Sequence, residues 1–188
     1  MNTKDKILET ALNLFNDGNT QMATTNHIAK AMDISPGNLH YHYKNREDII
    51  RVLYKQMREQ MSLSIEDLPQ NIKQLQEHQK LLLEVFWKYR FFYKELVFLF
   101  SRDADLEKMY VQDNLAHKKR IIKSIENFIN SGELVRLSDD MKEYLGDVIL
   151  MTTQFYLSYA KTLGKEIDKA VIQASIKHID LAFKSFIK

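Results

Sequence analysis

Residues 24–48 read TTNHIAKAMDISPGNLHYHYKNRED, and this stretch decides the fold of the N-terminal part of the chain. Ile28 and Ala29 give a short helix its apolar inner face. The helical pattern then breaks and restarts at Ser35, which suits an N-cap. Pro36 suits the first helical position, because that position needs no N–H donor. The stretch therefore predicts two short helices joined by a tight turn.

A further helix is predicted on each side of this pair. Upstream, residues 5–15 carry apolar side chains at helical spacing, and Gly18 ends the pattern. Downstream, Asn45 and Asp48 resemble a capping box, which starts a long helix predicted over residues 46–65. A group of helices in which a tight turn joins the second to the third matches helix-turn-helix geometry. In that geometry the third helix enters the major groove of DNA.

The third helix supplies the side chains expected to reach base edges. Gly37 permits close approach to the DNA, and the amide of Asn38 can pair with an adenine edge. His40 and Tyr41 can reach a phosphate or a thymine methyl group. The start of this helix is therefore the predicted base-reading element.

Phosphate contacts are expected from the residues on either side of the third helix. Thr25 and Asn26 stand at the start of the second helix, where side chains and backbone amides can meet phosphates. Lys44 and Arg46 open the following helix and carry positive charge that a phosphate can pair with.

The order and spacing of these residues resemble a known family. The stretch 3–53, with ILETALNLF at 7–15 and TTNHIAKAMDISPGNLHYHYKNREDII at 24–50, is similar to the N-terminal domain of the TetR family of bacterial transcriptional regulators. The resemblance implies a homodimeric regulator, predicted here to be a repressor, that binds a palindromic DNA operator and is controlled by a small, largely apolar effector. It also implies that DNA is touched by Thr25, Asn26, Pro36, Gly37, Asn38, His40, Tyr41, Lys44 and Arg46.

The rest of the chain is predicted to be helical, since the whole sequence contains only two prolines and five glycines. Pro69 marks a boundary, and the fold class is all-α. We assign residues 1–48 to a helix-turn-helix DNA-binding domain and residues 49–188 to a helical effector-binding and dimerisation domain. The helices predicted beyond the boundary cover 70–92 (with an extension toward 100), 105–110, 112–130, 139–163 and 167–186.

The run from Val85 to Phe100 is apolar almost all round, which is typical of a buried helix. The family resemblance implies that a central helix of this kind lines the effector cavity. Arg90 inside the run needs a partner, either Asp103 or Asp105 or an anionic ligand. The predicted pocket is walled by Trp87, Phe91, Phe98, Tyr110, Phe128, Met151, Phe155 and Tyr159. Each of these residues taken singly is also explained by core packing, because aromatic side chains at helical spacing usually fill a core.

The last two predicted helices carry wide apolar faces, which suit one contact with the core and another with a second subunit. The predicted dimer interface consists of Phe155, Ile172, Ile176, Ile179 and Phe183. The alternative is a monomer that uses these faces internally.

Other classes of function find little support in the sequence. There is no cysteine, and the net charge is only +2. No stretch of about 18 apolar residues and no signal peptide is present, so we expect a cytoplasmic protein without a membrane partner. The sequence lacks His-Glu-x-x-His, a phosphate loop and a dinucleotide glycine pattern, so we expect no enzyme, no metal site and no cofactor. The alternative function is an architectural DNA-binding protein without ligand control.

Overall fold

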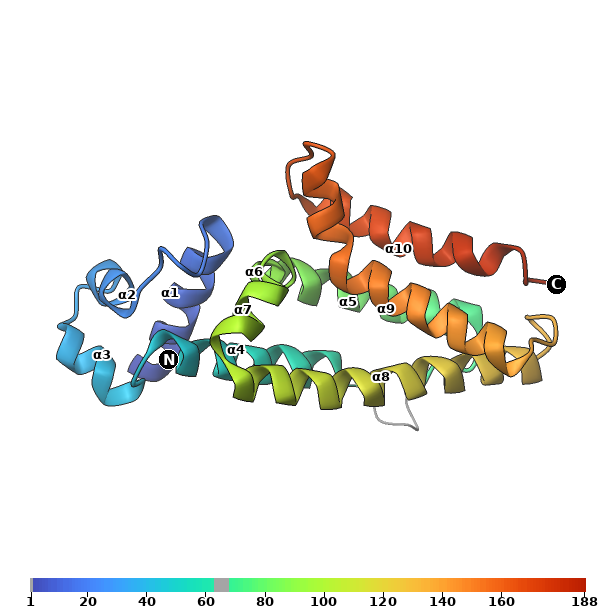
Figure 1. Ribbon diagram of the computed structural model, residues 1–188, viewed down its shortest axis with the longest axis horizontal. Helices are drawn as coiled ribbons and strands as arrows, with labels where there is room; N and C mark the ends of the chain where they lie inside the picture. Colours follow the sequence, from blue (N-terminus) through green and yellow to red (C-terminus); the bar gives the residue numbers. More distant parts are fainter. Residues whose placement is uncertain (1, 63–67) are drawn as a thin grey trace. The chain divides into compact units, whose positions relative to one another are not determined.

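The computed structural model describes residues 2–62 and 68–188, and over these residues its regular elements are helices (Figure 1). An isolated antiparallel bridge pairs Leu134 with Ile187. The all-α prediction is therefore confirmed. In chain order the helices are α1 (Thr3–Asp17), α2 (Thr25–Ala31), α3 (Pro36–His42), α4 (Arg46–Met61), α5 (Ile72–Lys88), α6 (Arg90–Lys94), α7 (Leu96–Arg102), α8 (Ala104–Asn130), α9 (Asp139–Thr162) and α10 (Lys169–Lys184).

The chain forms two compact units, named here the first and the second unit. The first consists of Met1–Gln60 and Tyr89–Glu107, and the second of Met61–Lys88 and Lys108–Lys188. The first unit therefore contains the segment predicted at 1–48 together with α4 as far as Gln60, α6, α7 and the start of α8. The chain passes from one unit to the other three times, the last time within α8.

Local capping sets the helices of the first unit, as the sequence predicts. Ser35 Oγ accepts a hydrogen bond from the N–H of Asn38 at 3.1 Å and caps α3. Asn45 Oδ1 accepts from the N–H of Asp48 at 2.8 Å at the start of α4. The predicted end of this helix near residue 65 lies outside the described residues.

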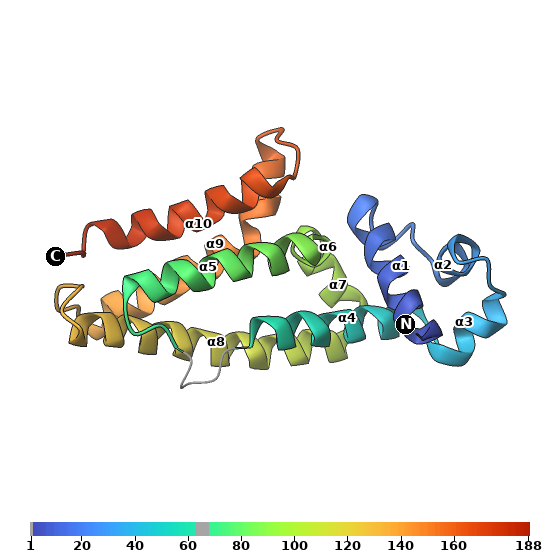
Figure 2. The same cartoon turned by 180° about the vertical axis from the view of Figure 1, so that it is seen from behind.

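The turn between α2 and α3 closes around Asp33. Its φ of +54° lies in the left-handed region, which residues with side chains adopt infrequently. The N–H of Ile34 donates to the carbonyl of Ala29 at 3.0 Å, which folds the chain back toward α2. Leu39 of α3 is fully buried, and Figure 2 shows α1, α2 and α3 gathered into one small bundle. The predicted helix-turn-helix arrangement is thereby present.

Aromatic residues from the middle of the chain complete the core of the first unit. The ring of Phe91 lies 5.3 Å from that of Phe15, measured between centroids, and the ring of Phe92 stacks on Tyr54 at 5.2 Å. Phe91 and Phe92 are both almost completely buried. Two rings of α6 thus pack on α1 and α4, which are far away in the sequence.

A single helix is predicted over 70–92, with an extension toward 100. That prediction is wrong beyond residue 88, and the packing of α6 explains why. The backbone leaves helical geometry at Tyr89 (ψ 29°) and again at Glu95 (ψ 16°), which separates α5, α6 and α7. A core contact distant in sequence therefore overrides the local preference for one long helix.

A second correction concerns α8. The separate helices predicted over 105–110 and 112–130 are one continuous helix, Ala104–Asn130. The segment contains neither glycine nor proline, so nothing in its backbone requires a break. Gly132 (φ +82°) and Gly164 (φ +72°) follow α8 and α9 in the left-handed conformation, as predicted for residues that end a helix.

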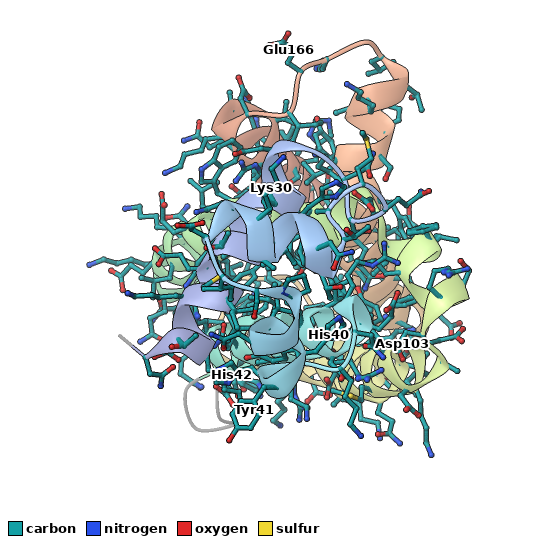
Figure 3. The ribbon with its side chains drawn as sticks, turned by 90° about the vertical axis from the view of Figure 1, so that its left-hand side faces the viewer. Lys30, His40, Tyr41, His42, Asp103 and Glu166 are labelled. Carbon is teal, nitrogen blue, oxygen red and sulfur yellow. The ribbon has the colours of Figure 1, made fainter. Side chains whose placement is uncertain are left out.

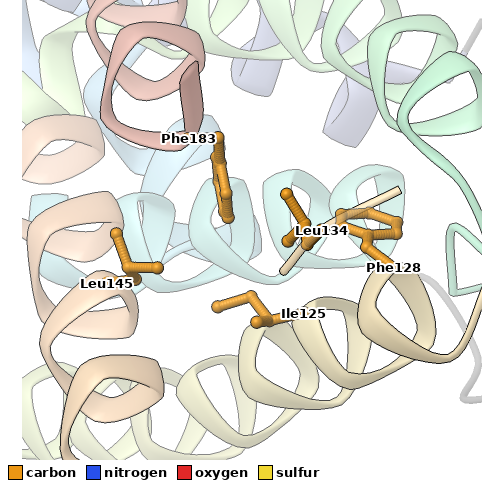
Figure 4. Close-up of a cluster of buried hydrophobic side chains, with 5 residues drawn as sticks. All are labelled: Ile125, Phe128, Leu134, Leu145 and Phe183. Carbon is orange, nitrogen blue, oxygen red and sulfur yellow. The ribbon is translucent and has the colours of Figure 1, made fainter. Parts of the chain in front are cut away.

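The core of the second unit lies between α8, α9 and α10. Ile125 and Phe128 of α8 meet Leu145 of α9 and Phe183 of α10, with Leu134 between the helices (Figure 4). Helices α9 and α10 pack along one another, as the views in Figures 1 and 2 agree. Their bounds differ from the predicted 139–163 and 167–186 by only one or two residues at any end.

Candidate functional site

The outer face of α3 is exposed to solvent. Tyr41 is 86% exposed, and His40 beside it is also exposed. Figure 3 views the end of the first unit that carries α2 and α3, with His40, Tyr41 and His42 labelled on α3. Leu39 and Tyr43 face the opposite way and are buried. Since Tyr41 contributes little to the core, its position suits contact with another molecule.

The first turn of α3 is open to solvent. Pro36, Gly37 and Asn38 are all exposed, while their helix is capped from Ser35. A Cβ added to Gly37 would meet no atom closer than Ser35 Oγ at 3.9 Å, and the backbone there does not have positive φ. Nothing inside the chain requires a glycine at this position. The absence of a side chain therefore leaves room for an external partner.

The start of α2 is built in a similar way. Thr24 caps the helix, since its Oγ1 accepts from the N–H of His27 at 3.4 Å. The next two residues are Thr25, which is half-buried, and Asn26, which is exposed. Helix starts carry partial positive charge from their unpaired N–H groups, so the starts of α2 and α3 both suit phosphate.

Lys44 is exposed at the end of α3, and its backbone is held in place from both sides. Its carbonyl oxygen lies 3.1 Å from His40 Nδ1, and its N–H donates to Asp48 Oδ2 at 3.1 Å. These bonds fix the link between α3 and α4 while leaving the Lys44 ammonium in solvent. The predicted contacts Asn26, Pro36, Gly37, Asn38, His40, Tyr41 and Lys44 are exposed residues of α2, α3 and the link that follows.

Arg46 differs from the other residues of the predicted set. Its guanidinium donates to the carbonyl of Thr20 at 2.7 Å and pairs with Glu47 at 2.7 Å. Its side chain is only 15% exposed. Burial alone would raise the pKa of Glu47, but the hydrogen bond and positive charge of Arg46 lower it below its usual value. Arg46 is thus engaged within the first unit and holds the loop ahead of α2.

Tyr43 is a core residue of the first unit. Burial, with a smaller effect of the Asp5 carboxylate, raises the pKa of Tyr43 to about 12. The phenol is therefore neutral at physiological pH. Its ring packs beneath the ammonium of Lys4, which lies 5.7 Å from the ring centroid.

A carboxylate from the middle of the chain supports the loop ahead of α2. Thr20 is fully buried, and Glu95 accepts from its N–H at 3.1 Å and from its hydroxyl at 2.5 Å. Nearby, Asn16 Oδ1 accepts from the N–H of Phe91 at 3.0 Å. These bonds could not be predicted from the sequence, because no local pattern links residues that are 75 positions apart.

The prediction that Arg90 pairs with Asp103 or Asp105 is wrong. Arg90 pairs with Asp17 at 3.4 Å, and neither Asp103 nor Asp105 is that partner. Asp103 instead pairs with Arg51 at 2.6 Å. The break at the start of α6 turns Arg90 toward α1, which places its guanidinium near Asp17.

The second unit contains a mainly apolar cavity of about 130 Å³. Its walls come from α5, α8, α9 and α10, with Met61, Leu68 and Pro69 beside them. On α5 the lining residues follow a stripe at 75, 78, 82 and 86, and on α8 they follow 117, 121, 124 and 128. These two helical stripes were present in the sequence and could have predicted the cavity.

The residues of the predicted pocket are spread over both units. Phe128 lines the cavity, while Phe91 is buried in the first unit and Phe98 borders a separate small cleft there. Trp87 and Tyr110 do not line the cavity. The three predicted residues on α9 are exposed: Met151, Phe155 and Tyr159.

The residues of the predicted dimer interface are also found in different surroundings, some at the cavity or buried and one on an exposed surface. Ile176, Ile179 and Phe183 line the cavity from α10, and Ile172 is buried. Phe155 stands instead on an exposed face of α9, named here the α9 stripe, which consists of Tyr144, Met151, Phe155 and Tyr159. The members of the α9 stripe are between 43% and 61% exposed.

No helix in the described part of the chain is long and apolar enough to cross a membrane.

Two family descriptions match the chain. Residues 7–53 match "Bacterial regulatory proteins, tetR family", and residues 53–188 match "TetR: Bacterial transcriptional repressor". The second match alone covers more than half of the sequence.

Curated relatives are named as transcriptional regulators. "Probable HTH-type transcriptional regulator YttP" of Bacillus subtilis (strain 168) is 25% identical over 115 residues, which are 60% of this chain and 56% of that protein. The chain thus spans less than two thirds of that relative. "Biofilm operon icaADBC HTH-type negative transcriptional regulator IcaR" of Staphylococcus epidermidis is 26% identical over 175 residues, which are 86% of this chain and 87% of that protein.

Solved structures share the fold. A TetR-family transcriptional regulator from Marinobacter aquaeolei VT8 superposes with a TM-score of 0.90 at 25% identity, covering 100% of this chain and 92% of that one. SmeT of Stenotrophomonas maltophilia in complex with triclosan gives a TM-score of 0.66 at 14% identity, and the superposition covers 99% of this chain and 92% of that one. At that identity the second likeness shows the fold alone.

The open environment of Gly37 leaves room for a methyl group within the protein. We expect Gly37→Ala to keep or raise the melting temperature, because alanine favours a helix over glycine by up to about 1 kcal/mol. We expect the same change to weaken DNA binding about tenfold, since the methyl group would occupy the space through which a base edge approaches. Thermal unfolding and fluorescence anisotropy on labelled duplex DNA measure the two effects.

Asn13→Ala is the matched control, because it raises helix propensity at an exposed position of α1 outside the candidate interface. Unchanged DNA affinity in Gly37→Ala would contradict the assignment of this surface to DNA.

Proposed function

This chain belongs to the TetR family of bacterial regulatory proteins, and from that premise we propose that it represses transcription by binding a palindromic operator as a homodimer under the control of a small ligand. The negative regulator IcaR, which aligns over most of both chains, supports the choice of repression. Because the proposed partner is the bacterial chromosome, we place the protein in the cytoplasm.

The observation that carries the proposal is the exposed first turn of α3. Asn38 and Tyr41 face solvent, Gly37 leaves space beside them, and the apolar face around Leu39 is buried. This is the arrangement in which a recognition helix lies in the major groove with its first residues at base edges. Asn26 and Lys44 flank it and suit phosphate contacts. Arg46 acts as a positioning residue for the loop ahead of α2, through its bond to Thr20.

The α9 stripe supports assembly into a dimer. Its members recur every four or seven residues, which places them on one face of α9, and each is a large apolar or aromatic side chain in solvent. The proposed cover is a second copy of the same face, related by a two-fold axis. Two recognition helices then read half-sites about 34 Å apart, which gives the palindromic operator.

The cavity of the second unit supports ligand control. Its apolar walls and few polar groups are typical of small-molecule sites. A ligand shifts DNA binding only if its affinity differs between the DNA-binding and the released conformation. An architectural protein without ligand control is the second candidate, and it would need no such cavity.

A salt-dependent binding titration tests the DNA-binding role. We expect purified protein to bind DNA flanking its own gene more tightly than scrambled DNA of equal length. Asn38→Ala should reduce this selectivity about 5- to 150-fold, because it removes a base contact worth about 1–3 kcal/mol. Lys44→Ala should weaken binding to both DNAs and lower the slope of log K against log salt by about one unit.

Lys55→Ala is the control, because it removes an exposed lysine of α4 away from α2 and α3. Equal and weak binding of the wild-type protein to both DNAs would rule out the regulator in favour of the architectural protein.

The dimer is tested separately by sedimentation velocity. We expect Phe155→Glu to convert a dimer into a monomer at micromolar concentration, since it places a charge in the centre of the proposed apolar contact. Leu81→Glu, at an exposed leucine of α5, is the control and should leave the dimer intact. A wild-type protein that sediments as a monomer, or a Phe155→Glu variant that stays dimeric, would exclude the α9 stripe as the interface.

A further inference from the structure

A single guanidinium in the first unit joins two carboxylates that are distant in sequence. Nη1 of Arg51 on α4 donates to Asp103 Oδ2 at 2.6 Å, and Nη2 donates to Asp48 Oδ1. Asp103 directly precedes α8 and follows Arg51 by 52 residues. The three side chains, named here the Arg51 bridge, therefore connect the first turns of α4 to the start of α8.

Each carboxylate of the Arg51 bridge uses its second oxygen to hold a backbone segment. Asp48 Oδ2 accepts from the N–H of Lys44 at 3.1 Å. Asp103 Oδ1 accepts from two N–H groups in the first turn of α8, at 3.0 and 3.1 Å. Because Arg51 binds the other oxygen of both carboxylates, it links the backbone between α3 and α4 to the backbone of α8.

The Arg51 bridge is largely covered by the protein. The side chain of Asp103 is only 6% exposed, and those of Arg51 and Asp48 are each 27% exposed. Ion pairs that are partly buried are screened by salt less than exposed pairs. Without Arg51, the Asp103 carboxylate would stay buried without its counter-charge, which is unfavourable. The bridge is thus a fixed part of the first unit.

Lys44 connects the Arg51 bridge to the candidate DNA surface. Its N–H is held by Asp48, while its ammonium is in solvent and forms no ion pair with the described residues. Where that ammonium lies depends on the backbone that carries it. A backbone that is already ordered lowers the entropic cost of a phosphate contact, so fixing Lys44 strengthens binding.

Arg51 is poorly suited to touch DNA itself. Both of its terminal nitrogens are engaged with carboxylates, and a phosphate would have to displace Asp48 or Asp103. An effect of Arg51 on DNA binding therefore has to pass through the groups that it holds.

We propose that Arg51 is a positioning residue for DNA binding, which fixes the backbone of Lys44, through Asp48, to the start of α8. The inference rests on the proposed function, since it takes Lys44 to meet a phosphate of the DNA.

Amide hydrogen exchange, followed by NMR on the full-length protein, tests the first step. We expect Arg51→Met to speed the exchange of the Lys44 N–H at least about fivefold, because the Asp48 carboxylate loses the partner that orients it. The N–H of Asn38 is the internal reference. Its bond to Ser35 Oγ is also 3.1 Å long but lies outside the bridge, so its exchange rate should not change.

A double-mutant cycle tests the second step by fluorescence anisotropy on the DNA that the wild-type protein selects. We expect Arg51→Met to weaken binding about five- to tenfold. Arg51→Met combined with Lys44→Ala should bind about as weakly as Lys44→Ala alone, because Arg51 acts through Lys44. Combined with Asn26→Ala on α2, by contrast, the two losses should multiply, since Asn26 is not held by the bridge.

Lys118→Met is the control for the loss of an ion-pair bridge as such. Lys118 also joins two carboxylates, Glu143 at 2.8 Å and Asp147 at 2.7 Å, but in the second unit. Its loss should change neither the DNA affinity nor the exchange at Lys44. Arg51→Lys keeps the charge and should recover part of the affinity that Arg51→Met loses. Thermal unfolding shows that each variant is folded, and Arg51→Lys carries the comparison, with smaller losses, if Arg51→Met is not.

Unchanged exchange at Lys44, wild-type affinity of the Arg51 variants, or losses that multiply in the cycle with Lys44 would overturn the inference. So would an equal effect of Lys118→Met. Failure of the proposed function gives a different result, because the wild-type protein then prefers no DNA sequence. In that case the inference falls with it, even if exchange at Lys44 becomes faster.

Discussion

A half-buried carboxylate holds the loop ahead of α2 in the first unit. Glu95 accepts both the N–H and the hydroxyl of Thr20, which has no access to solvent. A buried donor without its acceptor costs about 1–3 kcal/mol, so this pair ties the loop ahead of α2 to residues that follow 75 positions later. Arg46 strengthens the same loop by donating to the carbonyl of Thr20. The position of α2 and α3, the helices proposed to bind DNA, thus depends on Glu95 between α6 and α7 as well as on the helix-turn-helix sequence.

Sequence alone predicted the elements whose ends are decided by neighbouring residues. Ser35 and Asn45 form their caps with residues three positions later, and Gly132 ends α8 by its own backbone freedom. The breaks at Tyr89 and Glu95 could not be predicted in this way. Both residues are compatible with a helix, and the chain turns there because Phe91 and Phe92 fill a core formed by α1 and α4.

The candidate sites also differ in how far local sequence predicts them. The exposed residues of α2 and α3 follow from the helix-turn-helix pattern, because one face of each helix must be buried. The cavity was harder to predict, since the aromatic run around residue 91 was more conspicuous than the spaced residues of α5 that line it. Periodicity identifies an apolar face but not what covers it. On α10 that face covers the cavity, whereas on α9 the residues around Phe155 stand in solvent.

A double-mutant cycle on Thr20 and Glu95 tests most directly whether this contact sets the DNA-binding geometry. Thr20→Val removes the hydroxyl donor, and Glu95→Gln removes the charge with little change of shape. Affinity is measured on the DNA that the wild-type protein selects. We expect each single variant to bind more weakly and the double variant to bind no more weakly than the worse single one, because both remove the same interaction. Additive losses, or affinities equal to that of the wild-type protein, would contradict the dependence of α2 and α3 on Glu95.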